Sequence, residues 1–287
     1  MVFRTEYAYE GAVLHLIPDE VAQRLTVVFA SFLVWTAVFL IIYSRPTSDR
    51  LLKKAHANQI GVRTHRAELA TRLAAGIHAA FVATGAGSLV FFRKNNNLYV
   101  EKFLEPLTWP KFNVHNDDAV FYACVSAGFF IADFILCVVQ LEEQGTQFVV
   151  HAVAGLSGCV YCLMYGEGLL YLMLLMLFEV STPFLHMRWW LLEYEFKDTP
   201  IYTLNGLALV FAFTLFRLVI GVPVLLKMVY ELHTSPEKDR HDMPMRITFT
   251  LAPLAMIVLN SMWGMALWRG FLKAVGLIKD KKKVKSS

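Results

Sequence analysis

Residues Leu25–Tyr43 read LTVVFASFLVWTAVFLIIY, an apolar run that contains no charged side chain. A helix of about 20 such residues crosses the roughly 30 Å hydrocarbon core of a bilayer. Six further apolar runs follow, at Leu73–Phe92, Ala119–Val139, Phe148–Tyr165, Leu169–Met187, Leu204–Leu226 and Ile247–Leu267. The sequence therefore predicts an all-α polytopic membrane protein with seven transmembrane helices.

The composition agrees with a membrane protein and excludes other classes. Of the 287 residues, 56% are hydrophobic and 17% are charged, whereas about a quarter are charged in an average soluble domain. The mean hydropathy is +0.48. These values exclude a soluble enzyme, a disordered protein and a nucleic-acid partner. The cysteines, which all lie in apolar runs, predict no disulfide framework; they are Cys124, Cys137, Cys159 and Cys162.

Two basic clusters predict the orientation of the chain. The first lies between spans one and two and contains Arg45, Arg50, Lys53, Lys54, Arg63, Arg66 and Arg72. The second is the tail, with Lys273, Lys279, Lys281, Lys282, Lys283 and Lys285. Seven spans place both clusters on one side, which the positive-inside rule makes cytosolic. We therefore expect a lumenal N-terminus and a cytosolic C-terminus.

The last five residues read Lys283-Val-Lys285-Ser-Ser. Lysines at the third and fifth positions from the end resemble a dilysine signal, through which coat machinery returns proteins to the endoplasmic reticulum. The alternative is a basic flank that only fixes orientation. We expect the retrieval signal, and with it residence in the endoplasmic-reticulum membrane.

Ionisable side chains inside the predicted spans are the main candidates for function. Each costs about 2.5–3.5 kcal/mol at the centre of a membrane helix, so it normally faces a protein interior or a wet cavity. Five residues qualify: His78, Asp133, His151, Glu179 and Arg217. With the predicted orientation, the first three share the cytosolic half of the membrane and the last two lie near the midplane.

These residues suggest two pairs with different roles. Glu179 and Arg217 are most simply a buried ion pair, with ligand binding or catalysis as the alternative. Asp133 and His151 suit general base catalysis, in which a carboxylate orients an imidazole, or else form a structural hydrogen bond. His78 lines the same interior or bonds to a neighbouring helix. Their spacing predicts no metal site.

The densest polar motif is Glu179-Val-Ser181-Thr182-Pro183-Phe. Pro183 cannot donate a hydrogen bond to the carbonyl of Glu179, so we expect a kink and a free carbonyl beside a carboxylate. The hydroxyls of Ser181 and Thr182 are expected to satisfy part of the exposed backbone. Such a kink favours a cavity, or is simple helix geometry.

Together these motifs resemble the TLC-domain family, which includes translocating-chain-associating proteins, ceramide synthases and a ceroid-lipofuscinosis protein. The resemblance covers about Arg63–Lys273. Its carriers are Arg72 with His78, Gly128-Phe-Phe-Ile-Ala-Asp133, Val149-Val-His151, Glu179-Val-Ser-Thr-Pro-Phe-x-x-x-Arg188-Trp189, and Arg217. The last long motif is most similar to small TLC-domain-containing proteins rather than to ceramide synthases.

The resemblance implies a barrel-like bundle of six helices preceded by one further span. It divides the chain into an N-terminal part at 1–62, a TLC domain at 63–273 and a basic tail at 274–287. It also implies an interior cavity for acyl chains, lined by His78, Glu179, Ser181, Thr182, Arg188 and Arg217. Ceramide synthases carry paired histidines, whereas Val150-His151-Ala152 provides one.

The leading expectation is an endoplasmic-reticulum protein that handles acyl lipids and contributes to membrane lipid homeostasis. The first alternative is an acyltransferase of the ceramide-synthase type, with acyl-CoA and a sphingoid base as substrates. There His151 would act as the base and Asp133 would orient it. The second alternative is a cargo receptor or insertion helper. No cofactor is implied, and the oligomeric state stays open, a homodimer included.

Overall fold

The computed structural model describes residues 19–44, 62–100, 114–234 and 243–278. Within these ranges the regular secondary structure is helical, without strands. Seven helical units are long and apolar enough to span a membrane: Asp19–Ser44, Arg66–Phe92, Asp117–Val139, Thr146–Tyr165, Leu169–Glu193, Pro200–Thr234 and Arg246–Ala274. The predicted all-α class and seven spans are thus confirmed.

Five long α-helices and two composite spans make up these units. The long helices are α1 (Asp19–Ser44), α4 (Val62–Gly87), α5 (Asp117–Val139), α7 (Thr146–Tyr165) and α12 (Met243–Ala274). The fifth span joins α8 (Leu169–Met176), the 3-10 helix η3 (Leu177–Ser181) and α9 (Thr182–Glu193). The sixth joins α10 (Pro200–Phe213), the π-helix η5 (Thr214–Ile220) and α11 (Gly221–Thr234). Shorter elements are η1 (Ser88–Phe92), α6 (Leu141–Gln144) and η4 (Phe196–Asp198).

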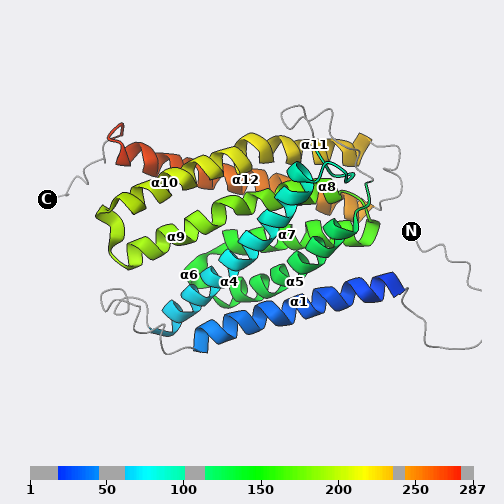
Figure 1. Ribbon diagram of the computed structural model, residues 1–287, viewed down its shortest axis with the longest axis horizontal. Coiled ribbons are helices and arrows are strands. Elements are labelled where there is room, and N and C mark those ends of the chain that lie inside the picture. The colour runs from blue at the N-terminus through cyan, green and yellow to red at the C-terminus, as the bar shows by residue number, and fades with distance from the viewer. Residues whose placement is uncertain (1–18, 45–61, 101–113, 235–242, 279–287) are drawn as a thin grey trace, which may run out of the picture.

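Six spans close into a ring. Along the ring, α4 packs on α5, α5 on α7, α7 on α12 and α12 on the α10–α11 span. The ring is completed because α10 packs on α9, which packs on α4. Helix α1 lies outside against α5 and α4 (Figure 1). The predicted barrel-like bundle with one additional N-terminal span is therefore observed.

Helix α8 fills one half of the ring. It contacts α4, α5, α7 and α11, and its buried residues are Leu169, Leu170, Tyr171, Leu172, Met173, Leu174 and Met176. The run Leu169–Phe178 is therefore packing surface and does not face lipid. The turn before it is tight because Gly166 and Gly168 both have a positive φ, at 69° and 73°, which favours glycine.

Helix α1 approaches α5 unusually closely at Gly128. A Cβ atom at this glycine would lie 2.5 Å from the Val28 carbonyl oxygen and 2.6 Å from the Phe32 nitrogen. Nearby, the Ser31 hydroxyl donates to the Val125 carbonyl at 2.7 Å. A small residue at the contact and a polar bond between the helices are the usual means by which membrane helices associate.

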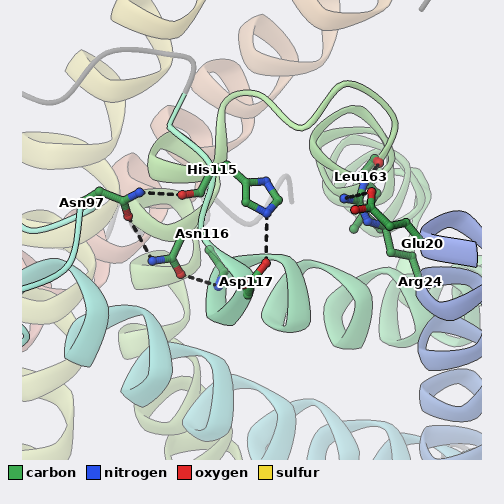
Figure 2. Close-up of polar contacts among 8 residues, drawn as sticks. Glu20, Arg24, Asn97, His115, Asn116, Asp117 and Leu163 are labelled. Carbon is green, nitrogen blue, oxygen red and sulfur yellow. Dashed lines mark hydrogen bonds and ion pairs between the residues drawn. The ribbon is translucent and has the colours of Figure 1, made fainter. Parts of the chain in front are cut away.

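Polar contacts at the end where α1 begins hold the neighbouring segments together (Figure 2). Arg24 of α1 donates to the Leu163 carbonyl of α7 at 2.7 Å. Asn116 caps α5 by accepting from the Ala119 nitrogen at 3.0 Å, and it donates to Asn97 at 3.1 Å. Helix α12 ends at the opposite end of the bundle from the start of α1 (Figure 1).

Candidate functional site

The fifth span changes its winding just before Pro183. Because Pro183 has no N–H to donate, the backbone N–H of Thr182 bonds instead to the carbonyl of Glu179, in a 3-10 turn. The carbonyl of Phe178 thereby loses the partner that an α-helix would give it. The Ser181 hydroxyl donates to this carbonyl at 3.0 Å. The expected irregularity is present, but the carbonyl of Glu179 is satisfied by the backbone, and the carbonyl to which side chains donate is that of Phe178.

Arg217 of the sixth span donates further hydrogen bonds to this irregular segment. Its Nε donates to the Phe178 carbonyl at 3.1 Å and to the Ser181 hydroxyl at 2.9 Å. Its Nη2 donates to the Thr182 hydroxyl at 3.1 Å, and its Nη1 donates to the Asn260 side-chain carbonyl of α12 at 3.4 Å. Arg217 lies within the π-helix η5, which packs against η3. Two irregular segments thus meet through one guanidinium.

The expected ion pair between Glu179 and Arg217 is present at the limit of direct contact. Arg217 Nη2 lies 3.9 Å from Glu179 Oε1. Thr182 connects the two groups, because it accepts from Arg217 and its side chain is hydrogen-bonded to Glu179. The Glu179 side chain is 15% exposed to solvent, and the Arg217 side chain is 7% exposed. The arginine therefore uses its donors in hydrogen bonds that hold the helices together, while part of the carboxylate remains accessible.

Glu179 is the electrostatic centre of the ionisable residues in the ring. It interacts with Asp133 of α5, with His78 of α4 and with His151 of α7. It also interacts with His186 of α9. Titratable groups of the second, third and fourth spans therefore lie around the 3-10 segment of the fifth span, together with His186 of the fifth span itself. The sequence predicted this grouping for all of them except His186.

His186 was missed although a signal for it existed. It is an ionisable residue within the predicted fifth span, one turn after Pro183. Both of its ring nitrogens are buried and lack a hydrogen-bond partner. Its ring faces Gly76 of α4, where an added Cβ would lie 3.5 Å from His186 Cδ2. At that distance an added methyl group would be in ordinary van der Waals contact with the imidazole.

The other two histidines differ in their surroundings. His78 is buried, stacks on Phe129 with ring centroids 3.7 Å apart, and hydrogen-bonds the Ser126 hydroxyl at 3.3 Å. Trp35 of α1 packs edge-on against His78 at 5.4 Å. His151 instead lies between aromatic rings and has a buried Nδ1 without a hydrogen-bond partner. His78 is therefore packed as a core residue, while His151 has unused bonding capacity.

The structure does not bring Asp133 and His151 into direct contact. Between these two described residues there is neither a hydrogen bond nor an ion pair, so Asp133 does not orient the imidazole in this conformation. The Arg188 guanidinium lies 4.7 Å from the Tyr202 ring centroid. Lys283 and Lys285 fall outside the described residues.

The four cysteines belong to the packed interior of the helix bundle. All four cysteines are buried and free, and Cys159 packs in the main hydrophobic core. Within the described part of the chain, no three His, Cys, Asp or Glu side chains are arranged as metal ligands.

Comparison with known proteins places the chain among its relatives. The TLC domain profile matches residues 68–269, which begins after α1 and includes every residue of the cluster. TLC domain-containing protein 4 A of Dictyostelium discoideum is 30% identical over 124 residues, 43% of this chain and 46% of that protein.

Two vertebrate relatives align over longer stretches. TLC domain-containing protein 4-B of Xenopus laevis is 26% identical over 156 residues, 53% of this chain and 58% of that protein. The human TLC domain-containing protein 4 is 23% identical over 163 residues, 55% and 60% of the two chains. The alignments therefore span about half of each of these relatives.

Proposed function

This chain belongs to the TLC-domain family, and we propose that it binds acyl lipids inside its helix ring and contributes to lipid homeostasis of the endoplasmic-reticulum membrane. The observation that carries the proposal is the cluster around Glu179. There, His151 and His186 keep buried ring nitrogens without protein partners. The C-terminal lysines Lys283 and Lys285 support the location.

The energetics favour a ligand with a polar group at this position. A buried polar atom without a hydrogen bond costs about 1–3 kcal/mol, and this cluster holds three such nitrogens, one on His151 and two on His186. A head group that donates to or accepts from them offsets that cost. The carboxylate of Glu179, which Arg217 does not neutralise by direct hydrogen bonds, adds an acceptor.

The location of the cluster supports a lipid rather than a soluble molecule. Helix α8 fills one half of the ring with apolar side chains, and the kink at η3 marks the point where the polar cluster begins. A ligand must therefore enter from the other half or through the ring wall, both within a membrane-spanning bundle. An acyl chain satisfies the apolar surroundings while its head group meets the polar cluster.

The test is an inventory by mass spectrometry of the lipids that co-purify with the full chain in a mild detergent. We expect acyl lipids with the wild type, and a loss of several fold in His151→Ala, His186→Ala and Asp133→Asn. The matched control is His115→Ala, since His115 is exposed and its imidazole pairs with Asp117 of α5 rather than with the cluster around Glu179. Equal retention in all four variants and the wild type would contradict the proposal.

The same preparation separates the alternatives. Turnover of acyl-CoA with a sphingoid base would identify an acyltransferase, in which Asp133 and His151 must approach each other on substrate binding. A reproducible set of co-purifying membrane or secretory proteins without bound lipid would instead favour a cargo receptor or insertion helper. Because no hydrogen bond joins Asp133 to His151 in this conformation, their arrangement gives the acyltransferase alternative no support.

A further inference from the structure

A second polar cluster lies at one end of the bundle, where α11 ends and α12 begins. It lines a pocket of about 290 Å³ formed by His233, Met243, Arg246, Ile247, Thr250 and Leu251. None of these residues belongs to the cluster around Glu179. This end is the one at which α1 starts (Figure 1).

Hydrogen bonds fix the position of the Arg246 guanidinium in this pocket. Arg246 can only donate, so its Nη2 donates to His233 Nδ1 at 3.1 Å. His233 must then carry its proton on Nε2, which donates to the Thr250 hydroxyl at 2.8 Å. Thr250 in turn donates to the Arg246 carbonyl at 2.7 Å. This closed chain holds the guanidinium in place.

The guanidinium nevertheless has unused bonding capacity. Its Nε is buried and lacks a hydrogen-bond partner. Within the described residues, no carboxylate forms an ion pair with Arg246. A positive charge that is held in place, and that offers a buried donor, favours an anionic oxygen ligand.

The apolar side of the pocket continues along the outer face of α12. Met243, Ile247 and Leu251 are 66%, 51% and 59% exposed, and their spacing of four residues places them on one face of the helix. Leu254 and Val258 extend this face at 42% and 57% exposure. The exposed apolar stripe faces lipid and starts directly beside the arginine.

The depth of Arg246 matches a lipid head group. It lies in the first turn of α12, where the long side chain of an arginine can place its charged group at the membrane–water interface. The pocket volume lies near the lower limit for small-molecule sites. It therefore suits a head group and the first methylenes, with the acyl chains continuing along the stripe.

From these features we infer that His233, Arg246 and Thr250 form a binding site for the head group of an anionic phospholipid, whose acyl chains lie along Ile247, Leu251 and Leu254. The site lies on the outer surface of the ring. It does not depend on the lipid-binding cluster around Glu179.

The test measures lipid retention by native mass spectrometry, using the full chain in nanodiscs of phosphatidylglycerol or of phosphatidylcholine. We expect the wild type to retain phosphatidylglycerol preferentially. Arg246→Gln should weaken that retention by about tenfold or more, because a charged hydrogen bond is lost. The matched control is Arg269→Gln, an exposed arginine near the other end of the same helix, which should behave as the wild type.

A second variant protects the test against a folding defect. His233→Ala removes the acceptor that positions the guanidinium and the donor to Thr250 but keeps the charge of Arg246, and His233 is exposed near the end of α11. It should weaken phosphatidylglycerol retention without affecting phosphatidylcholine. Equal retention by Arg269→Gln, Arg246→Gln and His233→Ala would overturn the inference. Displacement of phosphatidylglycerol by millimolar inorganic phosphate would also overturn it, by identifying a site for free phosphate.

Discussion

Arg217 donates from Nε to the carbonyl oxygen of Phe178 at 3.1 Å, so a side chain of the sixth span completes the backbone hydrogen bonding of the fifth. The relationship originates at Pro183, which shifts the local bonding by one residue and frees that carbonyl. It gives Arg217 a role in maintaining the kink that does not require a charge on Glu179. The two partners of the ion pair should therefore respond differently to neutralisation.

Arg217→Gln is expected to destabilise the protein far more than Glu179→Gln. The first change removes hydrogen bonds to Phe178, Ser181 and Thr182 at once, which we estimate at about 3–5 kcal/mol by analogy with broken buried charge networks. The second leaves those bonds in place and should cost about 1 kcal/mol. The measurement is the apparent melting temperature in detergent.

The double variant Glu179→Gln/Arg217→Gln shows whether Arg217 stabilises the protein mainly through its hydrogen bonds or mainly through its charge pairing with Glu179. We expect it to melt near the temperature of Arg217→Gln alone, because restoring electrical neutrality does not restore the hydrogen bonds that Arg217 donates to Phe178, Ser181 and Thr182. A double variant that recovers wild-type stability would show that charge pairing between Glu179 and Arg217 dominates.

Two glycines offer a matched test of how α1 is attached. Gly128→Ala would place a Cβ against backbone atoms of Val28 and Phe32, which cannot move aside as a side chain tip can. We expect a loss of about 1–3 kcal/mol from overpacking. Gly206→Ala in α10 meets nothing within 4 Å and should gain about 0.5–1 kcal/mol from helix propensity.

The readout for this pair is again the apparent melting temperature, because both substitutions add the same methyl group to a helical glycine. Shifts in opposite directions are expected. A similar shift for both variants would mean that the close approach of α1 to α5 contributes little to stability.

The number, order and type of the spans could be predicted because hydrophobic length is a local property of the sequence. The grouping of Asp133, His151 and Glu179 could be anticipated because charged groups in a membrane must share an interior. Which carbonyl Arg217 would reach could not be predicted, since it depends on the 3-10 and π segments facing each other. Neither the 3-10 segment nor the π segment changes the spacing of apolar residues along the sequence, so neither can be recognised from that spacing.

The missing contact between Asp133 and His151 has a similar cause. Shared depth in the membrane can be estimated from position along a span, whereas the direction of each side chain depends on helix rotation. Rotation in turn depends on close contacts such as that at Gly128, which a single sequence does not specify. His186 is not among the predicted site residues, although it lies within the predicted fifth span, close to its end.

The topology can be tested with engineered glycosylation sites, because the chain contains no natural Asn-x-Ser/Thr acceptor. The seven spans place the start of α1 and the end of α12 at opposite ends of the bundle. We expect a sequon added before Met1 to be glycosylated in microsomes. A sequon placed within Ala55–Gln59 should stay unmodified, and its glycosylation would refute a cytosolic first connection.

The C-terminal lysines allow a test of location in which total charge is held constant. Replacing Lys283 and Lys285 with serine should let the full chain leave the endoplasmic reticulum, because the proposed coat signal depends on lysines at the third and fifth positions from the end. The matched control replaces Lys281 and Lys282 with serine, which removes the same charge and leaves both signal positions intact. The measurement is acquisition of Golgi-modified glycans on the N-terminal sequon. Equal retention of both double variants would mean that the tail lysines act only through their charge, as a flank that orients the last span.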